Sequence, residues 1–122
     1  MAITVASIDV NETDKRHVIW CSRDGVNTGA TGDTGELGGE TISSSTWTAV
    51  TGAATTLTSS LAAITILHDD GTAVSYGINT VATVTIAGIT AGDDGNLTLL
   101  NRIVTSGSRT LDQTVIVPVE VH

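Results

Sequence analysis

The feature that most constrains the fold is the alternation of side chains in the last segment, "QTVIVPVEV" at residues 113–121. From residue 115 on, the odd positions are all valine and the even positions are mixed: Val115, Val117, Val119 and Val121 alternate with Thr114, Ile116, Pro118 and Glu120. A period of two is typical of a β-strand with one buried face. Proline has no N–H to give to a ladder, so we expect this strand to lie at a sheet edge near Pro118.

The same strand signature recurs along the chain. Alternation or β-branched runs predict further strands at 3–10, 16–22, 41–50, 61–68, 78–88 and 97–105. Thr, Val and Ile are abundant, and their branched side chains fit a pleated surface better than a helix. Phe is absent, so the core must be built mainly from Val, Ile, Leu and Ala.

Turn signals separate several of these segments. "HDDGT" at 68–72, "AGDDGN" at 91–96 and "TSGSRT" at 105–110 are typical of tight turns, and we expect Gly107 to take a positive φ in the last of them. A chain of 122 residues fits one domain. The sequence therefore predicts a single domain over 1–122, an all-β, Ig-like antiparallel β-sandwich of seven to eight strands.

A long irregular loop is expected at 23–40, where "GATGDTGELGGE" repeats glycine every third residue. Collagen needs many more triplets and abundant proline, and a phosphate-binding loop needs a following helix and tolerates few acids. The segment therefore predicts a mobile, Gly-rich acidic loop, and long loops are frequent contact sites. Candidate partner contacts are Asp33, Glu36, Leu37 and Glu40 in this loop, with Leu37 as the apolar residue that a partner would hold, and Pro118 at the strand edge.

Charge excludes some classes of partner. Thirteen acids against five Lys and Arg give a net charge of −8, which argues against nucleic acid and anionic membranes. No apolar stretch is long enough to span a bilayer, and Asp9 and Glu12 come too early for a signal peptide. The single Cys21 lies in an apolar run and is expected to be a buried, inert thiol. These features fit a protein made in a reducing cytoplasm.

No pattern for catalysis or metal binding is evident. The chain has no Gly-x-Ser-x-Gly, His-Glu-x-x-His or Cys-x-x-Cys motif. We expect His17, His68 and His122 to be exposed and without function. The acidic pairs at 69–70 and 93–94 lack the ligand spacing of a calcium loop and fit hairpin tips. We therefore expect no enzymatic activity, no metal and no cofactor.

Two segments together carry a resemblance. "GETISSSTWT" at 39–48 resembles the pattern Gly-acid-x-Ile-x-x-Ser-x-Trp. Residues 88–121 resemble a Gly-rich turn, a strand reading x-Asn-x-Ile-x-Thr, a Ser-Gly-Arg-like turn and a Val-rich final strand. The pair is similar to that of a group of small virion proteins of tailed bacteriophages, which are Ig-like β-sandwiches. The chain departs from that pattern in having Leu97–Leu100 where Tyr often precedes the Asn, and in the extra Ser108 before Arg109.

The resemblance implies a structural role in the virion. The expected function is a capsid decoration or cement protein that binds and stabilises the assembled head. Its partners would be the major capsid protein or other virion subunits, with copies forming a homo-oligomer on the particle. Two alternatives stay open: a tail or neck adaptor, and a receptor- or glycan-binding module. The glycan-binding module requires an exposed aromatic platform, for which Trp20, Trp47 and Tyr76 are the only aromatic residues.

Overall fold

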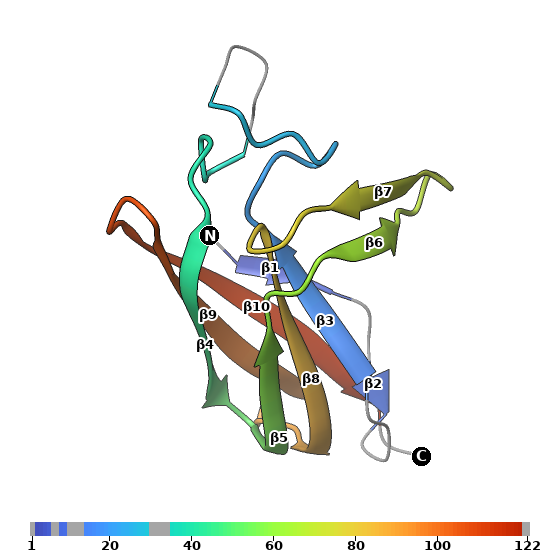
Figure 1. The fold of residues 1–122 in the computed structure, drawn as a ribbon. Helices are drawn as coiled ribbons and strands as arrows, with labels where there is room; N and C mark the ends of the chain where they lie inside the picture. The colour runs from blue at the N-terminus through green and yellow to red at the C-terminus, as the bar shows by residue number, and fades with distance from the viewer. Residues whose placement is uncertain (1, 6–7, 10–13, 30–34, 121–122) are drawn as a thin grey trace.

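The computed structural model describes residues 2–5, 8–9, 14–29 and 35–120, which form β-strands and no helix (Figure 1). The strands are β1 (Ala2–Thr4), β2 (Ile8–Asp9), β3 (Asp14–Ile19), β4 (Ile42–Thr51), β5 (Ala53–Ser60), β6 (Ile64–Leu67), β7 (Ala73–Tyr76), β8 (Val81–Thr90), β9 (Asn96–Thr105) and β10 (Thr110–Glu120). The predicted all-β fold is confirmed.

Two sheets face each other across the core. One has the order β1-β10-β9-β4, with β2 also pairing with β10, and the other has the order β3-β8-β5. Strands β1 and β2 run parallel to β10, whereas every other pair is antiparallel. Strands β6 and β7 form a separate hairpin at one end of the sandwich (Figure 1).

The core is aliphatic with three aromatic residues. It contains Val18, Trp20, Cys21, Leu37, Ile42, Trp47, Tyr76, Val81, Ala82, Val84, Ile86, Ile89, Leu97, Leu99, Ile103, Val115 and Val117. Val115 and Val117 are fully buried, and Val119 is partly buried against the same cluster. The alternation of the last strand thus predicted its buried face. Cys21 is buried as expected.

Strand β4 departs from simple alternation. Ile42 and Trp47 lie five residues apart, which would place them on opposite faces of a regular strand. Both are nevertheless buried, because the pairing of β4 with β9 shifts register between Ile42 and Ser44. Such a bulge turns the side chains that follow it to the other face.

Gly52 is the only residue between β4 and β5, which belong to different sheets. Its φ of 77° is favourable for glycine, and a Cβ there would lie 2.5 Å from the carbonyl oxygen of Thr90. The chain therefore crosses from one sheet to the other at a single residue that has no room for a side chain.

Several strand predictions need correction. The segment 3–10 contains two short strands, β1 and β2, instead of one. Ile78, placed in the predicted strand 78–88, precedes β8 and is 64% exposed. The sequence reading missed β5 and β7, because their small and hydroxyl side chains alternate weakly. Val121 lies outside the described residues.

The expected edge position of Pro118 is wrong in part. Strand β10 is flanked by β9 on one side and by β1 and β2 on the other. The pairing with β1 ends at Ile116 and the pairing with β2 begins at Val119. Val119 donates its N–H toward Gly95 on the β9 side, so by alternation the nitrogen of Pro118 faces the gap between β1 and β2. The missing donor therefore falls where the neighbouring strand changes.

The three predicted turns are present. The acidic pairs lie at hairpin tips, where Asp70 accepts from the N–H of Thr72 and Asp94 accepts from the N–H of Asn96. In the β9–β10 turn, however, Ser108 takes the positive φ, 63°, instead of Gly107.

Candidate interaction site

The segment between β3 and β4 is irregular, as predicted, but its described part is anchored. The Leu37 side chain is fully buried in the core, and its N–H donates to the carbonyl of Trp20 at 3.2 Å. The expectation that a partner would hold Leu37 is therefore corrected, because the core of its own chain already holds it. Burial of a leucine is worth about 1.5–3 kcal/mol, which fixes this part of the loop against the sandwich.

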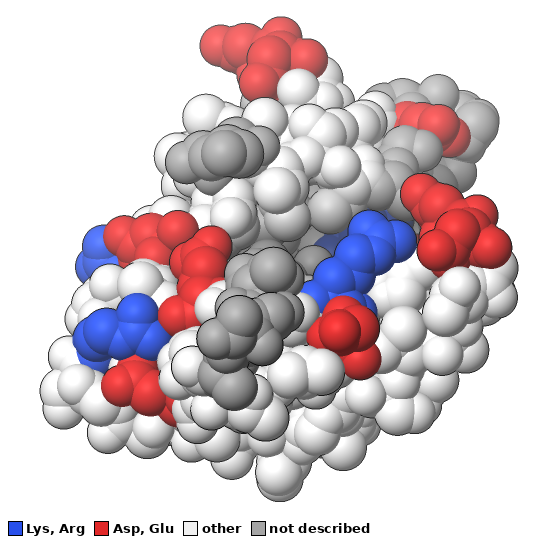
Figure 2. All heavy atoms as spheres, turned by 90° about the horizontal axis from the view of Figure 1, so that it is seen from above, with Lys and Arg blue, Asp and Glu red and all other residues white. Residues whose placement is uncertain are grey.

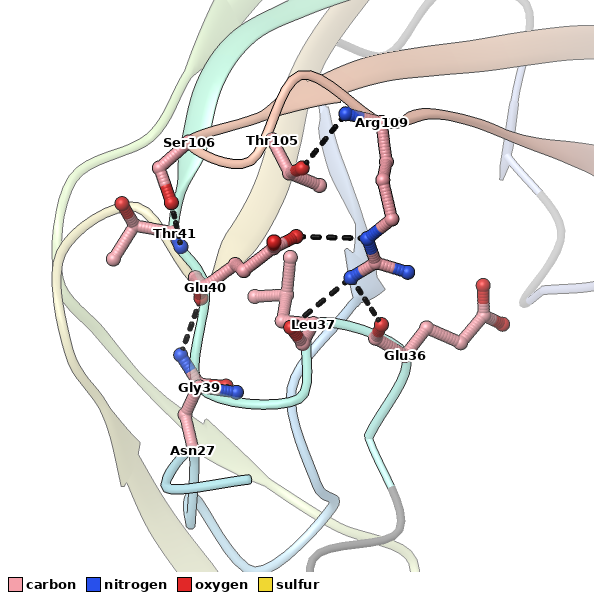
Figure 3. A network of polar contacts seen from close by, with 9 residues as sticks. All are labelled: Asn27, Glu36, Leu37, Gly39, Glu40, Thr41, Thr105, Ser106 and Arg109. Carbon is pink, nitrogen blue, oxygen red and sulfur yellow. Dashed lines mark hydrogen bonds and ion pairs between the residues drawn. The ribbon is translucent and has the colours of Figure 1, made fainter.

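Arg109 fastens the same loop to the β9–β10 turn (Figure 3). Its Nε donates to Oε1 of Glu40 at 2.8 Å, and its Nη2 donates to the carbonyls of Glu36 at 2.9 Å and Leu37 at 3.1 Å. The backbone N–H of Arg109 donates to Oγ1 of Thr105 at 3.1 Å. We call these five residues, Glu36, Leu37, Glu40, Thr105 and Arg109, the loop clamp.

The Glu40 carboxylate is the centre of the loop clamp. A hydrogen bond from the Thr105 hydroxyl, followed by the one from the Arg109 guanidinium, holds the pKa of Glu40 below its ordinary value. Gly107 lies against this carboxylate, and a Cβ at residue 107 would overlap the Glu40 oxygens. A side chain at residue 107 would therefore displace the Glu40 carboxylate from its place in the loop clamp.

Backbone contacts close the other side of the loop (Figure 3). The Asn27 side chain accepts from the N–H of Gly39 at 2.8 Å and donates to the carbonyl of Glu40 at 2.6 Å. Ser106 exchanges two hydrogen bonds with Thr41, one through its N–H and one through its hydroxyl. The part of the loop from 35 to 41 is thus held on both flanks.

Asn101 forms a second polar group below the loop clamp. Its side chain is fully buried, accepts from Nε1 of Trp20 at 2.9 Å and donates to Oγ of Ser45 at 3.0 Å. Asn101 is also the ladder partner of Trp47 on β4. A buried amide with these partners links β4, β9 and the residue that follows β3, and it satisfies the indole N–H of Trp20.

The two segments that carry the sequence resemblance meet at these contacts. Glu40 and Ser45 come from 39–48, and they bond Arg109 and Asn101 from 88–121. Arg109 and Asn101 lie in the second segment of the resemblance, but neither is among the contact residues predicted from the sequence. The signal that would have selected Arg109 is its charge, since it is one of only five Lys and Arg in an acidic chain.

The five predicted contact residues do not form one site. Glu36, Leu37 and Glu40 lie together in the loop clamp. Pro118 lies eight residues along β10 from Thr110, roughly 25 Å away at the ordinary rise of a strand. Asp33 lies outside the described residues. The structure therefore does not place the loop and Pro118 on a single contact surface.

A different part of the chain stands out by its lack of charge. Residues 41–67 contain no Asp, Glu, Lys or Arg, and they form β4, β5 and β6. We call these residues the uncharged stretch. On the face drawn in Figure 2, by contrast, Lys and Arg side chains lie close to acidic ones. Among the described residues, ion pairs join Arg16 to Asp14, Arg102 to Asp112 and Arg109 to Glu40.

The histidines differ from expectation. His17 and His68 are half-buried, and His122 lies outside the described residues. His17 shares a hydrogen bond of 2.9 Å with the Thr83 hydroxyl, and burial lowers its pKa. His68 Nε2 lies 2.7 Å from the hydroxyl of Tyr76, which itself donates to the carbonyl of Arg23. The Tyr76 hydrogen is thereby used, so His68 Nε2 must carry the donor hydrogen.

An open cleft of about 320 Å³ lies between β3 and the β6–β7 hairpin. Its lining mixes apolar side chains with Arg16, His17, Arg23, His68 and Asp69. Within the described ranges, no three His, Cys, Asp or Glu side chains come together in a way that could hold a metal ion.

Comparisons with known proteins identified no protein that is similar to this chain. No protein-family model, no curated protein and no solved structure matches the chain. Among the described residues there is also no helix long and apolar enough to cross a membrane.

Proposed function

We propose that this protein is a non-enzymatic structural subunit of a tailed-phage virion, which attaches to the assembled head as a decoration or cement protein. The observation that carries the proposal is the contact between the two segments of the resemblance. Glu40 bonds Arg109 at 2.8 Å, and Ser45 bonds Asn101 at 3.0 Å. Residues that resemble the virion group at separate places in the sequence therefore act as one structural unit.

The strand order supports the Ig-like part of this proposal. Ig-type sandwiches of the constant kind place strands B, E and D next to one another in one sheet and C, F and G in the other. Here β3-β8-β5 and β4-β9-β10 have the same order and the same succession along the chain. The difference lies in the first strand, since β1 and β2 pair with β10 and not with β3.

The glycan-binding alternative loses its expected platform. Trp20, Trp47 and Tyr76 are 1%, 8% and 2% exposed, and they are all the aromatic residues of the chain. A sugar-stacking surface needs an exposed ring, so the receptor-binding module is not proposed further.

The test is depletion and add-back. Particles stripped of this protein should bind it again, and more tightly than free major capsid subunits do, because a site that spans neighbouring subunits exists only after assembly. Added salt should weaken attachment, since a chain of charge −8 would dock on basic patches. Equal binding to free subunits, or no binding to particles, would contradict the proposal.

Imaging with a labelled antibody separates the two remaining positions on the virion. A decoration protein should be labelled over the whole head. Label confined to the neck or the tail would replace decoration with the adaptor role, and label on neither would remove the virion proposal altogether.

A further inference from the structure

The edge strands of the two sheets differ in how well they are protected against pairing with another strand. An exposed edge strand offers unpaired N–H and C=O groups to any other strand, and proteins commonly block it with charges, bulges, proline or short length. In the described residues the sandwich has edges at β1 with β2, at β3, at β4 and at β5.

Three of these edges carry a recognised block. Strands β1 and β2 have three and two residues, and Pro118 faces the gap between them. Strand β3 begins with Asp14, Lys15 and Arg16, and the Arg16 guanidinium bonds the carbonyl of Lys15 at 2.7 Å. Strand β4 has two register shifts, one on each side of its central residues.

Strand β5 has none of these blocks. Its eight residues, "AATTLTSS", contain no charge, no proline and no glycine, and their pairing with β8 keeps one register throughout. Within the described part of the chain, β5 is paired on one side only. Thr55, Thr58, Ser59 and Ser60 are exposed along it. Figure 1 shows β5 at the side of its sheet away from β3.

We propose that β5 pairs with β5 of a second copy of this chain, antiparallel about a two-fold axis, to form the continuous sheet β3-β8-β5-β5-β8-β3. This inference stands on the chemistry of the edges and does not depend on the proposed function.

The charge distribution selects a second copy as the occupant. In a two-fold interface each residue near the axis meets its own kind, so any charge there faces a like charge. Copies of charge −8 repel one another generally, and a strand without charge is where they can approach.

The sequence of β5 is also compatible with itself. Antiparallel pairing centred on Leu57 sets Leu57 against its own copy, Thr56 against Thr58 and Thr55 against Ser59, and Thr–Thr and Thr–Ser pairs are favourable across strands. A single pair of strands buries less than a standard interface, so we expect association that depends on concentration.

The test uses Thr58→Lys, which places a charge on the exposed face of β5, and Thr48→Lys as its matched control on the bulged edge β4. Both threonines are exposed in β-strands. Sedimentation velocity from micromolar to millimolar concentration should show wild-type monomers passing to dimers. Thr58→Lys should lower the association constant about tenfold or more, and Thr48→Lys should leave it near that of the wild type.

Two further readouts keep the outcome decisive. A mixture of Thr58→Lys and Thr58→Glu proteins should associate better than either protein alone, because residue 58 and its copy lie diagonally across the axis on one face of the sheet, where opposite charges on long side chains attract. Amide hydrogen exchange in β5 should slow as wild-type concentration rises. A wild type that remains monomeric, a closed trimer or larger ring, or equal losses in both lysine variants would overturn the proposal.

Discussion

The loop clamp and the uncharged stretch use the chain in opposite ways. In the loop clamp, Arg109 bonds one carboxylate and two carbonyls, so that charge holds a long irregular segment in place. The uncharged stretch begins at the very next residue after Glu40 and continues to Leu67 without any Asp, Glu, Lys or Arg. Charge therefore serves internal attachment in the loop clamp and is absent from the strands β4, β5 and β6.

The same contrast appears within one sheet. Strands β3 and β5 both pair with β8, yet β3 carries three consecutive charged residues and β5 carries none. Since the central strand is common to both, pairing with it does not explain the difference. The difference lies in the outer side of each strand, because β3 carries charges that block an edge and β5 carries no recognised block.

The largest expected effect tests whether the loop is truly anchored. Leu37→Ala should lower the free energy of unfolding by about 2–4 kcal/mol, because it leaves a cavity in the core. Leu67→Ala is the matched control in the uncharged stretch, where Leu67 is 71% exposed, and it should change stability by less than about 0.5 kcal/mol. Urea denaturation measures both. Similar values for the two variants would remove the distinction between the clamped loop and the open side.

A smaller effect tests the part that charge plays in the clamp. Arg109→Ala should cost about 1–2 kcal/mol, since it removes one ion pair and two carbonyl bonds. Arg102→Ala removes only the exposed pair with Asp112 and should lower stability less than Arg109→Ala does. If thermal and urea unfolding rank the two variants in the reverse order, Arg109 contributes no more to stability than an ordinary exposed arginine, and the loop clamp is contradicted.

A change of pH should sharpen the same point. The folded pKa of Glu40 lies below its ordinary value of 4.5, so the unfolded chain takes up the proton first as pH falls. The stability that this carboxylate adds is complete above about pH 4.5 and is lost as pH falls through the folded pKa. The stability difference between wild type and Glu40→Gln should therefore narrow in acid. A difference that stays constant from pH 7 down to pH about 3 would speak against the clamp.

The smallest effect concerns His17 on the closed edge β3. Burial lowers its pKa from the ordinary 6.5, so its neutral ring is favoured in the folded state. Its contribution is complete above about pH 6.5 and declines as pH falls from there toward the folded pKa. NMR titration should place this pKa below 6.5, and His17→Gln should show a flatter stability profile in that window. A pKa at or above 6.5 would mean that the β3 edge is more open than the structure shows.

Much of the sandwich is predictable from its sequence, and the failures have physical causes. The valines of β10 alternate strictly, because one face is buried along its length, and that face was found. The bulge near Ser44 was not found, since nothing in "TISSSTW" marks the residue that shifts the register. Strand β5 was not predicted, because its small uncharged side chains give no contrast between its two faces. The same lack of charge leaves its edge without a block.

The candidate site was predicted less well than the fold. Glu36, Leu37 and Glu40 were predicted as partner contacts, whereas in the structure Glu40 and the Glu36 carbonyl bond Arg109 and Leu37 is buried in the core. A single apolar residue among glycines and acids has the same appearance whether it fills a partner's pocket or its own core. Only the three-dimensional position of Trp20, whose carbonyl accepts from Leu37, distinguishes the two.

Gly52 has a consequence for how the molecule folds. It is the only residue between β4 in one sheet and β5 in the other. Once β4 aligns on β9, β5 is brought to its place beside β8 with almost no further loop to close, so little additional chain entropy is lost. We therefore expect the two sheets to form in one cooperative step, because Gly52 links a strand of one sheet directly to a strand of the other.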